Sequence, residues 1–383
     1  MTVTEPAGFV AAGVAAGIKT SGAPDLALVV NEGPQFTAAG VLTGNRVKAA
    51  PVKWTQQVLK AGALRAVVLN SGGANACTGP RGFHDTHATA ERVAATLGVG
   101  AAEVAVCSTG LIGEYLPMDA VLSGVDLAVA ALSGDGGPDA ARAVMTTDTR
   151  PKSVHVTGDG YSIGGLAKGA GMLAPGLATM LVVLTTDAAL EPGVADSALR
   201  SATRVTFDRL DSDGAMSTND TVLLLASGAS GVIPDVRAFT AELTTACGDL
   251  AAQLLSDAEG ATKEVAVTVR GAVTEDDAVV VARAVARNNL VKCALFGQDP
   301  NWGRILAAVG TTDAVFDADA VDVAVNDVWI CRAGAAADDR AGVDLTGREV
   351  AVTIDLHAGD RDATVWTNDL SHAYVHENSA YSS

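Results

Sequence analysis

Short apolar runs alternate with longer stretches of helical spacing along the whole chain. Residues 25–31 and 64–70 are Val- and Leu-rich runs that end beside turn-forming residues, a pattern typical of buried strands. Residues 84–98 place small and apolar side chains at helical spacing and end on a glycine. Two alternating runs within 153–165 flank an Asp-Gly pair, which predicts a β-hairpin. The same patterns predict further strands at 103–107, 263–269, 320–330, 349–356 and 362–367, and further helices at 54–61, 117–132, 138–147, 235–258 and 275–288.

This interleaving of strands and helices predicts an α/β (or α+β) protein in which helices cover layered sheets. The pattern changes between 235 and 260, where we expect a smaller C-terminal α/β domain to begin, at about 240–360. The chain has 383 residues, of which 49% are hydrophobic and 18% are charged. This composition supplies enough apolar surface for a core and excludes intrinsic disorder.

The charge of the chain is strongly acidic, with 44 Asp and Glu against 26 Lys and Arg and a net charge of −18. Such a chain repels phosphate backbones and anionic lipids, so we expect no nucleic-acid partner and no membrane surface. The apolar run 8–18 follows Glu5 and precedes the first basic residue, Lys19, unlike a secretory signal. The uncharged stretch 169–186 contains Pro175 and several glycines, unlike a membrane span. We therefore expect a cytoplasmic protein, in which an anionic substrate needs a local cation.

Disulfides, metal sites and nucleotide sites are not expected. The five cysteines are far apart and never form a C-x-x-C pair, which fits a reducing compartment. His84 and His87, like His372 and His376, are spaced for one helix face but lack the glutamate or cysteine of a zinc motif. The Gly-x-Gly at 169–171 is followed four residues later by proline, which would break the helix of a dinucleotide loop.

The most unusual segment runs from Lys168 to Ala188 and places a hydroxyl where an apolar run begins. Thr179 precedes the run 180–184 and follows an approach rich in glycine and proline. One interpretation is a β-branched residue that opens a buried strand. The other is self-cleavage, in which the Thr179 hydroxyl attacks the Ala178 carbonyl and hydrolysis then frees Thr179 as a new N-terminus. Its α-amino group, with a reference pKa of about 7.7–8.0, would then serve as the base for its own hydroxyl. The residue pattern leaves both interpretations open.

Long motifs in a fixed order extend over nearly the whole chain. They are the run from Lys168 to Leu181 together with Gly8–Lys19, Asn45–Pro51, Asn70–Gly79, Ser108–Gly113, Met145–Lys152, Ser217–Thr221, Glu259–Ala261, Asp299–Arg304 and Glu377–Tyr381. In this order they resemble the motifs of the ornithine acetyltransferases (glutamate N-acetyltransferases) of arginine biosynthesis. One stretch departs from that pattern: residues 213–216 read Asp-Gly-Ala-Met, where many members carry Asp-Gly-Asp-Thr.

The resemblance implies a self-cleaving enzyme with a layered α-β-β-α sandwich, the fold that this family shares with related aminopeptidases. Cleavage between Ala178 and Thr179 would give an α-chain, 1–178, and a β-chain, 179–383, which associate as an α2β2 heterotetramer. Thr179 is the implied nucleophile, and Thr109 and Gly110 are the implied oxyanion hole. A hydroxyl and a backbone N–H on one glycine-containing loop can both point at a developing oxyanion. Without the resemblance, the same pair is interpreted as an ordinary strand-ending turn.

The implied reaction moves the acetyl group of N-acetylornithine to glutamate through an acetyl-Thr179 ester in a ping-pong cycle, without a cofactor. Acetyl-CoA as a second acetyl donor is left open. Both substrates carry an α-carboxylate, and Lys168 matches a substrate-binding position that supplies the needed cation. The remaining matches to binding positions are Thr146, Thr179, Glu259, Asn378 and Ser383.

Two other interpretations stay open. Related aminopeptidases use the same self-cleaving architecture with water in place of glutamate as the acyl acceptor. The matches at Lys168 and Asn378 speak against this alternative. The chain could also be an uncleaved structural or regulatory relative, although such a protein would have no use for a nucleophile at position 179.

Overall fold

The computed structural model of the chain describes residues 2–174 and 180–380. These residues form two units: the first is made of the described residues within 1–208 and 215–257, and the second of those within 209–214 and 258–380. Among the described residues, no helix combines the length and the apolar character needed to cross a membrane.

The first unit contains a four-stranded sheet with the strand order β1-β2-β4-β5. β1 and β2, and β2 and β4, are antiparallel, whereas β4 and β5 are parallel. Every residue of β2, β4 and β5 is buried because both faces of these strands are covered, which explains their uninterrupted apolar sequences. The strands are β1 (Phe9–Val14), β2 (Leu26–Asn31), β4 (Ala66–Ser71) and β5 (Val104–Thr109).

A second, five-stranded sheet of this unit has the order β3-β9-β8-β7-β6. The predicted hairpin is present as β6 and β7, and β7 continues antiparallel to β8 with Lys168 opposite Leu181. β8 and β9 are parallel and fully buried. The strands are β3 (Thr37–Leu42), β6 (Lys152–Thr157), β7 (Ser162–Lys168), β8 (Leu181–Thr186) and β9 (Thr221–Ala226).

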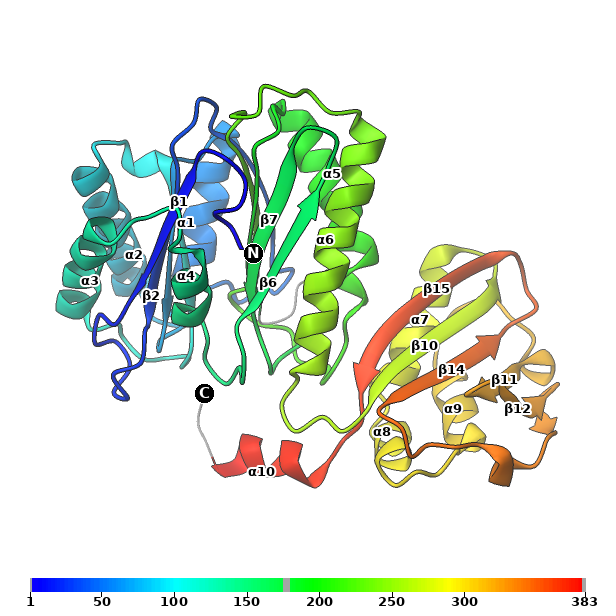
Figure 1. Cartoon of the computed structure of the whole chain (residues 1–383). Coiled ribbons are helices and arrows are strands. Elements are labelled where there is room, and N and C mark those ends of the chain that lie inside the picture. The colour runs from blue at the N-terminus through cyan, green and yellow to red at the C-terminus, as the bar shows by residue number, and fades with distance from the viewer. Residues whose placement is uncertain (1, 175–179, 381–383) are drawn as a thin grey trace. The chain divides into compact units, whose positions relative to one another are not determined.

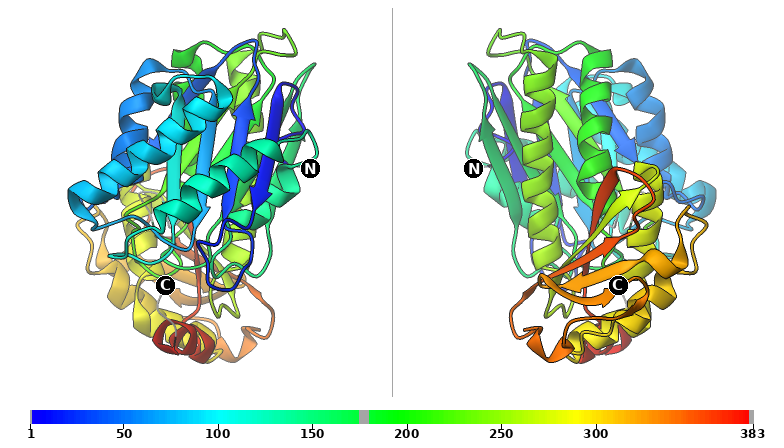
Figure 2. Two further views of the ribbon diagram at one scale, coloured as in Figure 1. Left: turned by 90° about the vertical axis from the view of Figure 1, so that its left-hand side faces the viewer. Right: turned by 90° about the vertical axis from the view of Figure 1, so that its right-hand side faces the viewer.

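The two sheets pack face to face between two layers of helices. Alternate residues of β2 and β8, such as Val29 and Val183, share one core between the sheets. The opposite face of β2 packs on α2 and α3 through a second core that includes Leu28 and Val93. On the far side, α5 contacts β3, and α6 contacts β6 and β7; Figure 1 shows this layering, and the right-hand view of Figure 2 shows α5 and α6 side by side. The predicted α-β-β-α sandwich is confirmed.

The helices of the first unit begin and end where the sequence supplies the usual signals. Proline stands in the first turn of α2, and Gly98 ends that helix in the left-handed conformation. The Asp235 side chain caps α6 by accepting from two backbone N–H groups. The helices are α1 (Ala50–Val58), α2 (Gly79–Leu97), α3 (Met118–Ala130), α4 (Gly137–Ala143), α5 (Pro192–Val205) and α6 (Val236–Ser256), with 3₁₀ turns at Leu59–Ala61 and Ala101–Glu103.

The second unit is built on a six-stranded mixed sheet with the order β13-β12-β11-β14-β10-β15. One face of this sheet packs on α7 and α9 around residues such as Val267 and Val281. The short stretch Arg209–Gly214 joins this unit through a hydrogen bond from the Asp211 N–H to the Trp366 carbonyl. The elements are β10 (Glu264–Ala272), α7 (Glu275–Ala286), α8 (Asn289–Phe296), α9 (Trp302–Val309), β11 (Asp322–Val325), β12 (Val328–Arg332), β13 (Ala335–Ala336), β14 (Glu349–Asp355), β15 (Arg361–Asn368) and α10 (His372–Ala380), with 3₁₀ turns at Ala318–Ala320 and Arg340–Gly342.

Several predicted boundaries differ from the structure. The single strand predicted at 320–330 is wrong, because Asn326 and Asp327 both adopt positive φ and turn the chain into the hairpin of β11 and β12. The helix predicted at 54–61 begins four residues earlier, because Pro51 suits a first helical turn. The helix predicted at 84–98 begins at Gly79, and the helix predicted at 138–147 ends at Ala143.

Candidate active site

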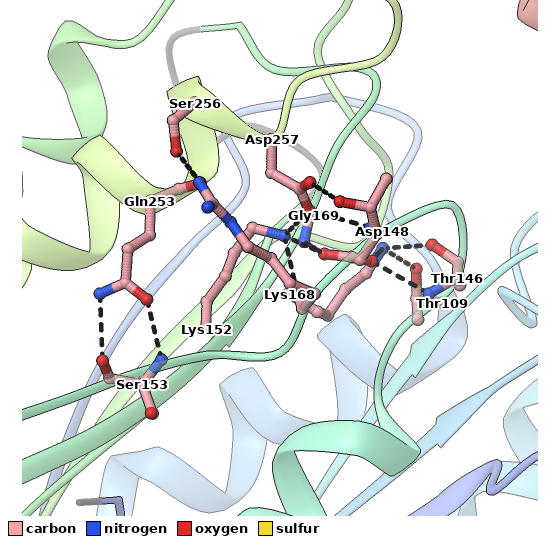
Figure 3. A network of polar contacts seen from close by, with 12 residues as sticks. Thr109, Thr146, Asp148, Lys152, Ser153, Lys168, Gly169, Gln253, Ser256 and Asp257 are labelled. Carbon is pink, nitrogen blue, oxygen red and sulfur yellow. Dashed lines mark hydrogen bonds and ion pairs between the residues drawn. The ribbon is translucent and has the colours of Figure 1, made fainter.

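Lys168, the last residue of β7, lies at the centre of a buried polar network. Its side chain is only 2% exposed. Its Nζ donates hydrogen bonds to Thr146 Oγ1 at 2.8 Å and to Thr109 Oγ1 at 3.2 Å. Figure 3 shows these side chains converging from the ends of β5 and β7 and from the loop after α4. The structure therefore brings together three of the predicted site residues, which lie 37 and 22 positions apart in the sequence.

The second predicted oxyanion residue, Gly110, directly follows Thr109 at the end of β5. Gly110 has a φ of +127°, a conformation that L-residues rarely adopt. Within the described part of the chain, its backbone N–H has no hydrogen-bond acceptor. The Thr109 hydroxyl accepts from Lys168, so its own proton remains available for donation. A hydroxyl proton and a backbone N–H are thus presented by consecutive residues.

The Thr109–Gly110 turn is held against the loop that follows β4. The Thr109 carbonyl accepts hydrogen bonds from the N–H groups of both Gly72 and Gly73, each at 3.0 Å. A Cβ on Gly110 would lie 2.5 Å from the Gly73 nitrogen, so no other residue fits here without a backbone shift. Near the end of β4, Asn70 accepts from the Ser108 hydroxyl at 2.6 Å and donates to the Gly73 carbonyl at 3.0 Å. The close packing of the two backbones therefore requires glycine at position 110.

Asp148, which is not among the predicted site residues, is the carboxylate that balances Lys168. Its oxygens accept from Lys152 Nζ at 2.6 Å and from the Gly169 N–H at 2.7 Å, and Lys168 Nζ lies 4.0 Å away. Burial alone would raise the pKa of this carboxyl, but the charges of Lys168 and Lys152 and the hydrogen bonds outweigh it and lower the pKa to about 2. Asp148 is therefore ionised at neutral pH.

A second buried ion pair extends the network toward α6. Lys152 is fully buried at the start of β6 and donates to Asp257 at 2.6 Å as well as to Asp148. Asp257, at the C-terminal end of α6, also accepts from the backbone N–H of Thr149 at 3.1 Å and from its hydroxyl. Because one lysine binds two carboxylates, the loop that carries Thr146 is fixed from both sides.

Lys19 is another cation of this site, and it is not among the predicted site residues. Its Nζ donates to the carbonyl of Met145 at 2.7 Å, directly before Thr146, and to the carbonyl of Pro24 at 3.0 Å. Burial lowers the pKa of Lys19, Asp25 opposes this shift, and the like charge of Lys168 adds to it. Two lysine charges thus lie close enough to influence each other in a protein whose net charge is strongly negative.

Two predicted binding residues, Glu259 and Asn378, meet within the second unit. Asn378 Nδ2 donates to Glu259 Oε2 at 3.0 Å and to the Tyr374 carbonyl at 3.0 Å. Gly260, beside Glu259, is packed so closely on Tyr374 that a Cβ there would lie 2.2 Å from the Tyr374 nitrogen. α10 is thereby anchored to the segment that carries Glu259.

The remaining predicted site residues, Ala178, Thr179 and Ser383, lie outside the described residues. The described residues contain no group of three or more His, Cys, Asp or Glu side chains arranged to hold a metal ion.

Comparison of the sequence with known proteins identifies one family. The ArgJ family model matches residues 10–383. The chain is 65% identical over 383 residues to the arginine biosynthesis bifunctional protein ArgJ of Streptomyces coelicolor, with both chains fully covered. It is 61% identical over 389 residues to the ArgJ protein of Mycobacterium tuberculosis, covering 100% of this chain and 96% of that one. A solved structure of ornithine acetyltransferase complexed with ornithine, also from M. tuberculosis, is 63% identical and covers 47% of this chain and 96% of that chain, with a TM-score of 0.45.

Proposed function

Because this chain belongs to the ArgJ family, we propose that it transfers the acetyl group of N-acetylornithine to glutamate by way of Thr179. The protein is a bifunctional acyltransferase of arginine biosynthesis, acting as ornithine acetyltransferase and as N-acetylglutamate synthase. For the second activity, acetyl-CoA is the acetyl donor that we propose. The residue roles given below belong to the same proposal.

The enzyme first makes its own nucleophile by cutting the chain between Ala178 and Thr179. The Thr179 hydroxyl adds to the Ala178 carbonyl carbon, and the C–N bond breaks as the nitrogen takes up a proton. Water then hydrolyses the resulting ester, leaving the Ala178 carboxylate, a free hydroxyl and a free α-amino group on Thr179. A threonine hydroxyl is a weak nucleophile until a base accepts its proton, and the new α-amino group is such a base.

Acetyl transfer then takes place in two matched steps. The Thr179 oxygen adds to the acetyl carbonyl of N-acetylornithine, and the C–N bond breaks with a proton passing to the departing ornithine amine. The acetyl-Thr179 ester is then attacked by the neutral amine of glutamate, which releases N-acetylglutamate and restores the hydroxyl. With acetyl-CoA, a thiol leaves in place of ornithine. Each step passes through a tetrahedral oxyanion.

Thr109 and Gly110 stabilise that oxyanion, and Lys168 supports them. Since the Lys168 ammonium group donates to the Thr109 hydroxyl, it polarises this hydroxyl and strengthens its donation to the oxyanion. The same cation compensates a substrate α-carboxylate, with Thr146 as a hydroxyl partner. This shared contact of Lys168 with Thr109 and Thr146 is the observation that carries the proposal.

The other predicted binding residues act on the polar ends of the substrates. The Glu259 carboxylate suits the side-chain ammonium group of ornithine, and Asn378 orients that carboxylate through their hydrogen bond. Ser383 is the last of the proposed binding residues.

The proposed cut would leave the two chains interleaved in one sheet. β3, β6 and β7 belong to 1–178, whereas β8 and β9 belong to 179–383. The order β3-β9-β8-β7-β6 therefore places the two strands of the β-chain between strands of the α-chain. This supports a stable αβ unit, and we propose that two such units form an α2β2 heterotetramer.

The decisive experiment compares the wild-type chain with Thr179→Ala and Thr179→Ser. We expect two wild-type fragments on a denaturing gel, with N-terminal sequencing of the C-terminal fragment beginning Thr-Met-Leu-Val. Thr179→Ala should stay uncut and inactive, whereas Thr179→Ser should retain slower cleavage. Thr203→Ala, which removes a buried hydroxyl from α5, is the matched control. Acetyl transfer to glutamate is measured with N-acetylornithine and with acetyl-CoA as donors, which tests both activities. Hydrolysis of the donor without transfer to glutamate would favour an aminopeptidase-like reaction.

A further inference from the structure

The segment Ser217–Thr221 has no role in the mechanism described so far, although it contacts both parts of the proposed machinery. It leads into β9 and is buried throughout. Its own backbone is well anchored, since the Thr218 carbonyl accepts from the Ala49 N–H at 3.0 Å and the Asp220 carbonyl accepts from the Thr43 N–H at 2.9 Å. Such a segment can hold other groups in place because it is itself fixed.

Asn219 binds the loops that build the oxyanion turn. Its Nδ2 donates to the Ser108 carbonyl at 2.8 Å, directly before Thr109, and to the Ala74 carbonyl at 2.6 Å. Its Oδ1 accepts from the Thr218 hydroxyl at 2.6 Å, which fixes the orientation of the amide. The amide of this side chain therefore joins the end of β5 to the loop that follows β4.

The next residue, Asp220, binds the first described residue after the proposed cleavage site. Its Oδ1 accepts from the Met180 N–H at 3.2 Å. Thr221 then donates its own N–H to the Met180 carbonyl at 3.1 Å. The N–H and the carbonyl of Met180 are thus both held by consecutive residues of one segment. Met180 is bonded directly to Thr179, so its N–H belongs to the peptide plane that carries the Thr179 carbonyl.

The Asp220 carboxyl is fully buried, and its other oxygen, Oδ2, has no hydrogen-bond partner among the described residues. Burial raises the pKa of Asp220 well above its usual range. Three effects oppose this shift: the hydrogen bond from the Met180 N–H, a hydrogen bond with the Ser217 side chain, and the positive charge of Lys168. Burial therefore disfavours the charged form of this carboxyl. An ionised carboxyl one residue from the new N-terminus would favour the ammonium form of Thr179, whereas the mechanism needs the neutral amine.

We propose that Asn219 and Asp220 form a positioning pair that holds the oxyanion turn and Met180, the residue bonded to Thr179, in one fixed relation. Asn219 fixes the Ser108 carbonyl before the turn, and Asp220 fixes the Met180 N–H after the junction. Neither residue needs to exchange a proton for this role. The inference rests on the proposed function, because it assigns the support of that same nucleophile and oxyanion hole.

The test for Asp220 compares Asp220→Ala with Asp220→Asn in the full chain. The asparagine oxygen can accept the same hydrogen bond and is always neutral, so Asp220→Asn should cleave at nearly the wild-type rate. Asp220→Ala should slow the appearance of the two fragments about tenfold, the effect of losing one hydrogen bond. Asp211→Asn removes an equally buried carboxyl from the second unit and should cleave normally. Fragments are followed by time-resolved denaturing gels after synthesis of the chain in a cell-free system.

Each outcome for Asp220 decides the proposal. Wild-type cleavage by Asp220→Ala would overturn it, and so would an asparagine variant as slow as the alanine variant, since a titrating carboxyl would then be required. If Asp220→Ala does not fold, Asp220→Glu replaces it, because its carboxyl is displaced by one methylene. Cleavage must then be slow in the glutamate variant and fast in the asparagine variant, and equal rates would count against positioning.

Asn219 is tested on the mature, fully cleaved enzyme. Asn219→Ala should lower kcat about tenfold with little change in KM, because the turn acts on the transition state rather than on bound substrate. A change in KM alone, or no change, would remove Asn219 from the pair. The proposed function fails by different results, namely a Thr179→Ala chain that is still cut or a wild-type enzyme without acetyl transfer.

Discussion

The Lys168 ammonium group donates a 3.2 Å hydrogen bond to the Thr109 hydroxyl, joining the end of β7 to the end of β5. The proposed oxyanion hole is therefore built next to a fixed positive charge. This charge is buried and is balanced by Asp148. A perturbation of the lysine should consequently be measurable both in substrate binding and in the chemical step.

Replacing Lys168 by methionine should lower kcat/KM for both N-acetylornithine and glutamate. The loss of hydrogen bonds to a charged group corresponds to about 1.5–3 kcal/mol, or about 10- to 150-fold. Steady-state kinetics of the cleaved enzyme measure this effect. Lys53→Met, which removes an exposed lysine from α1, is the control. Unchanged kinetics in Lys168→Met would show that this lysine serves neither the substrate nor the oxyanion.

A methyl group at position 110 should disable the turn without removing any polar group. The added Cβ of Gly110→Ala would lie 2.5 Å from the Gly73 nitrogen and 2.7 Å from the Gly72 carbonyl carbon, so the turn must move. A displaced oxyanion donor should reduce kcat about 10²- to 10³-fold. Gly98→Ala, at another positive φ with no atom within 4 Å of the new Cβ, separates backbone strain from the steric clash. Equal kcat values for the two variants would argue against the assigned oxyanion hole.

The lowered pKa of Asp148 makes a prediction about acid stability. Its folded pKa of about 2 lies below the ordinary value of 3.8 for an aspartate. Its ionisation therefore stabilises the folded state above pH 4, and this stabilisation is lost as the pH falls toward 2. The shift corresponds to about 2 kcal/mol. Asp148→Asn should therefore unfold at lower urea concentration than wild type at pH 7, with a difference that shrinks below pH 4. The exposed Asp135→Asn serves as control, and a constant difference across the pH range would contradict the assignment.

The proposed α-amino base predicts the pH dependence of activity. The Thr179 amine must be neutral, its reference pKa is about 7.7–8.0, and a nearby lysine charge would lower that value. Activity should therefore rise with pH along a single ionisation near neutrality. Each histidine is replaced in turn: His84, His87, His155, His357, His372 and His376. If any one replacement abolishes this rise in a fully cleaved enzyme, a side-chain base must take the place of the amine.

The sequence predicted the central strands well because of how they are buried. β2 and β4 are covered on both faces, so they appear as uninterrupted apolar runs that need no knowledge of their partners. The β11–β12 hairpin was missed because its turn residues, Asn326 and Asp327, interrupt an apolar run without glycine or proline. The Asn-Asp pair could have predicted this turn, because both residue types tolerate a positive φ.

The candidate site was predictable only through the family resemblance. Thr109, Thr146 and Lys168 stand on separate elements, and no local spacing predicts that their hydroxyl and ammonium groups meet. Asp257 was missed for a related reason. Its partner, Lys152, lies 105 residues earlier, and an ion pair across that separation leaves no periodic pattern in the sequence.

The interleaved order of the five-stranded sheet has a consequence for how the mature protein can be assembled. Before the cut, unfolding and refolding are events within one molecule. After a cut at position 178, the unfolded state consists of two separate chains, so refolding becomes a second-order reaction whose rate depends on protein concentration. During refolding, β8 and β9 of the β-chain would have to insert between β3 and β7 of the α-chain, and these two strands must already be correctly positioned. Refolding of the cut protein would thus slow on dilution, and at low protein concentration the persistence of the mature enzyme would be governed by its rate of unfolding.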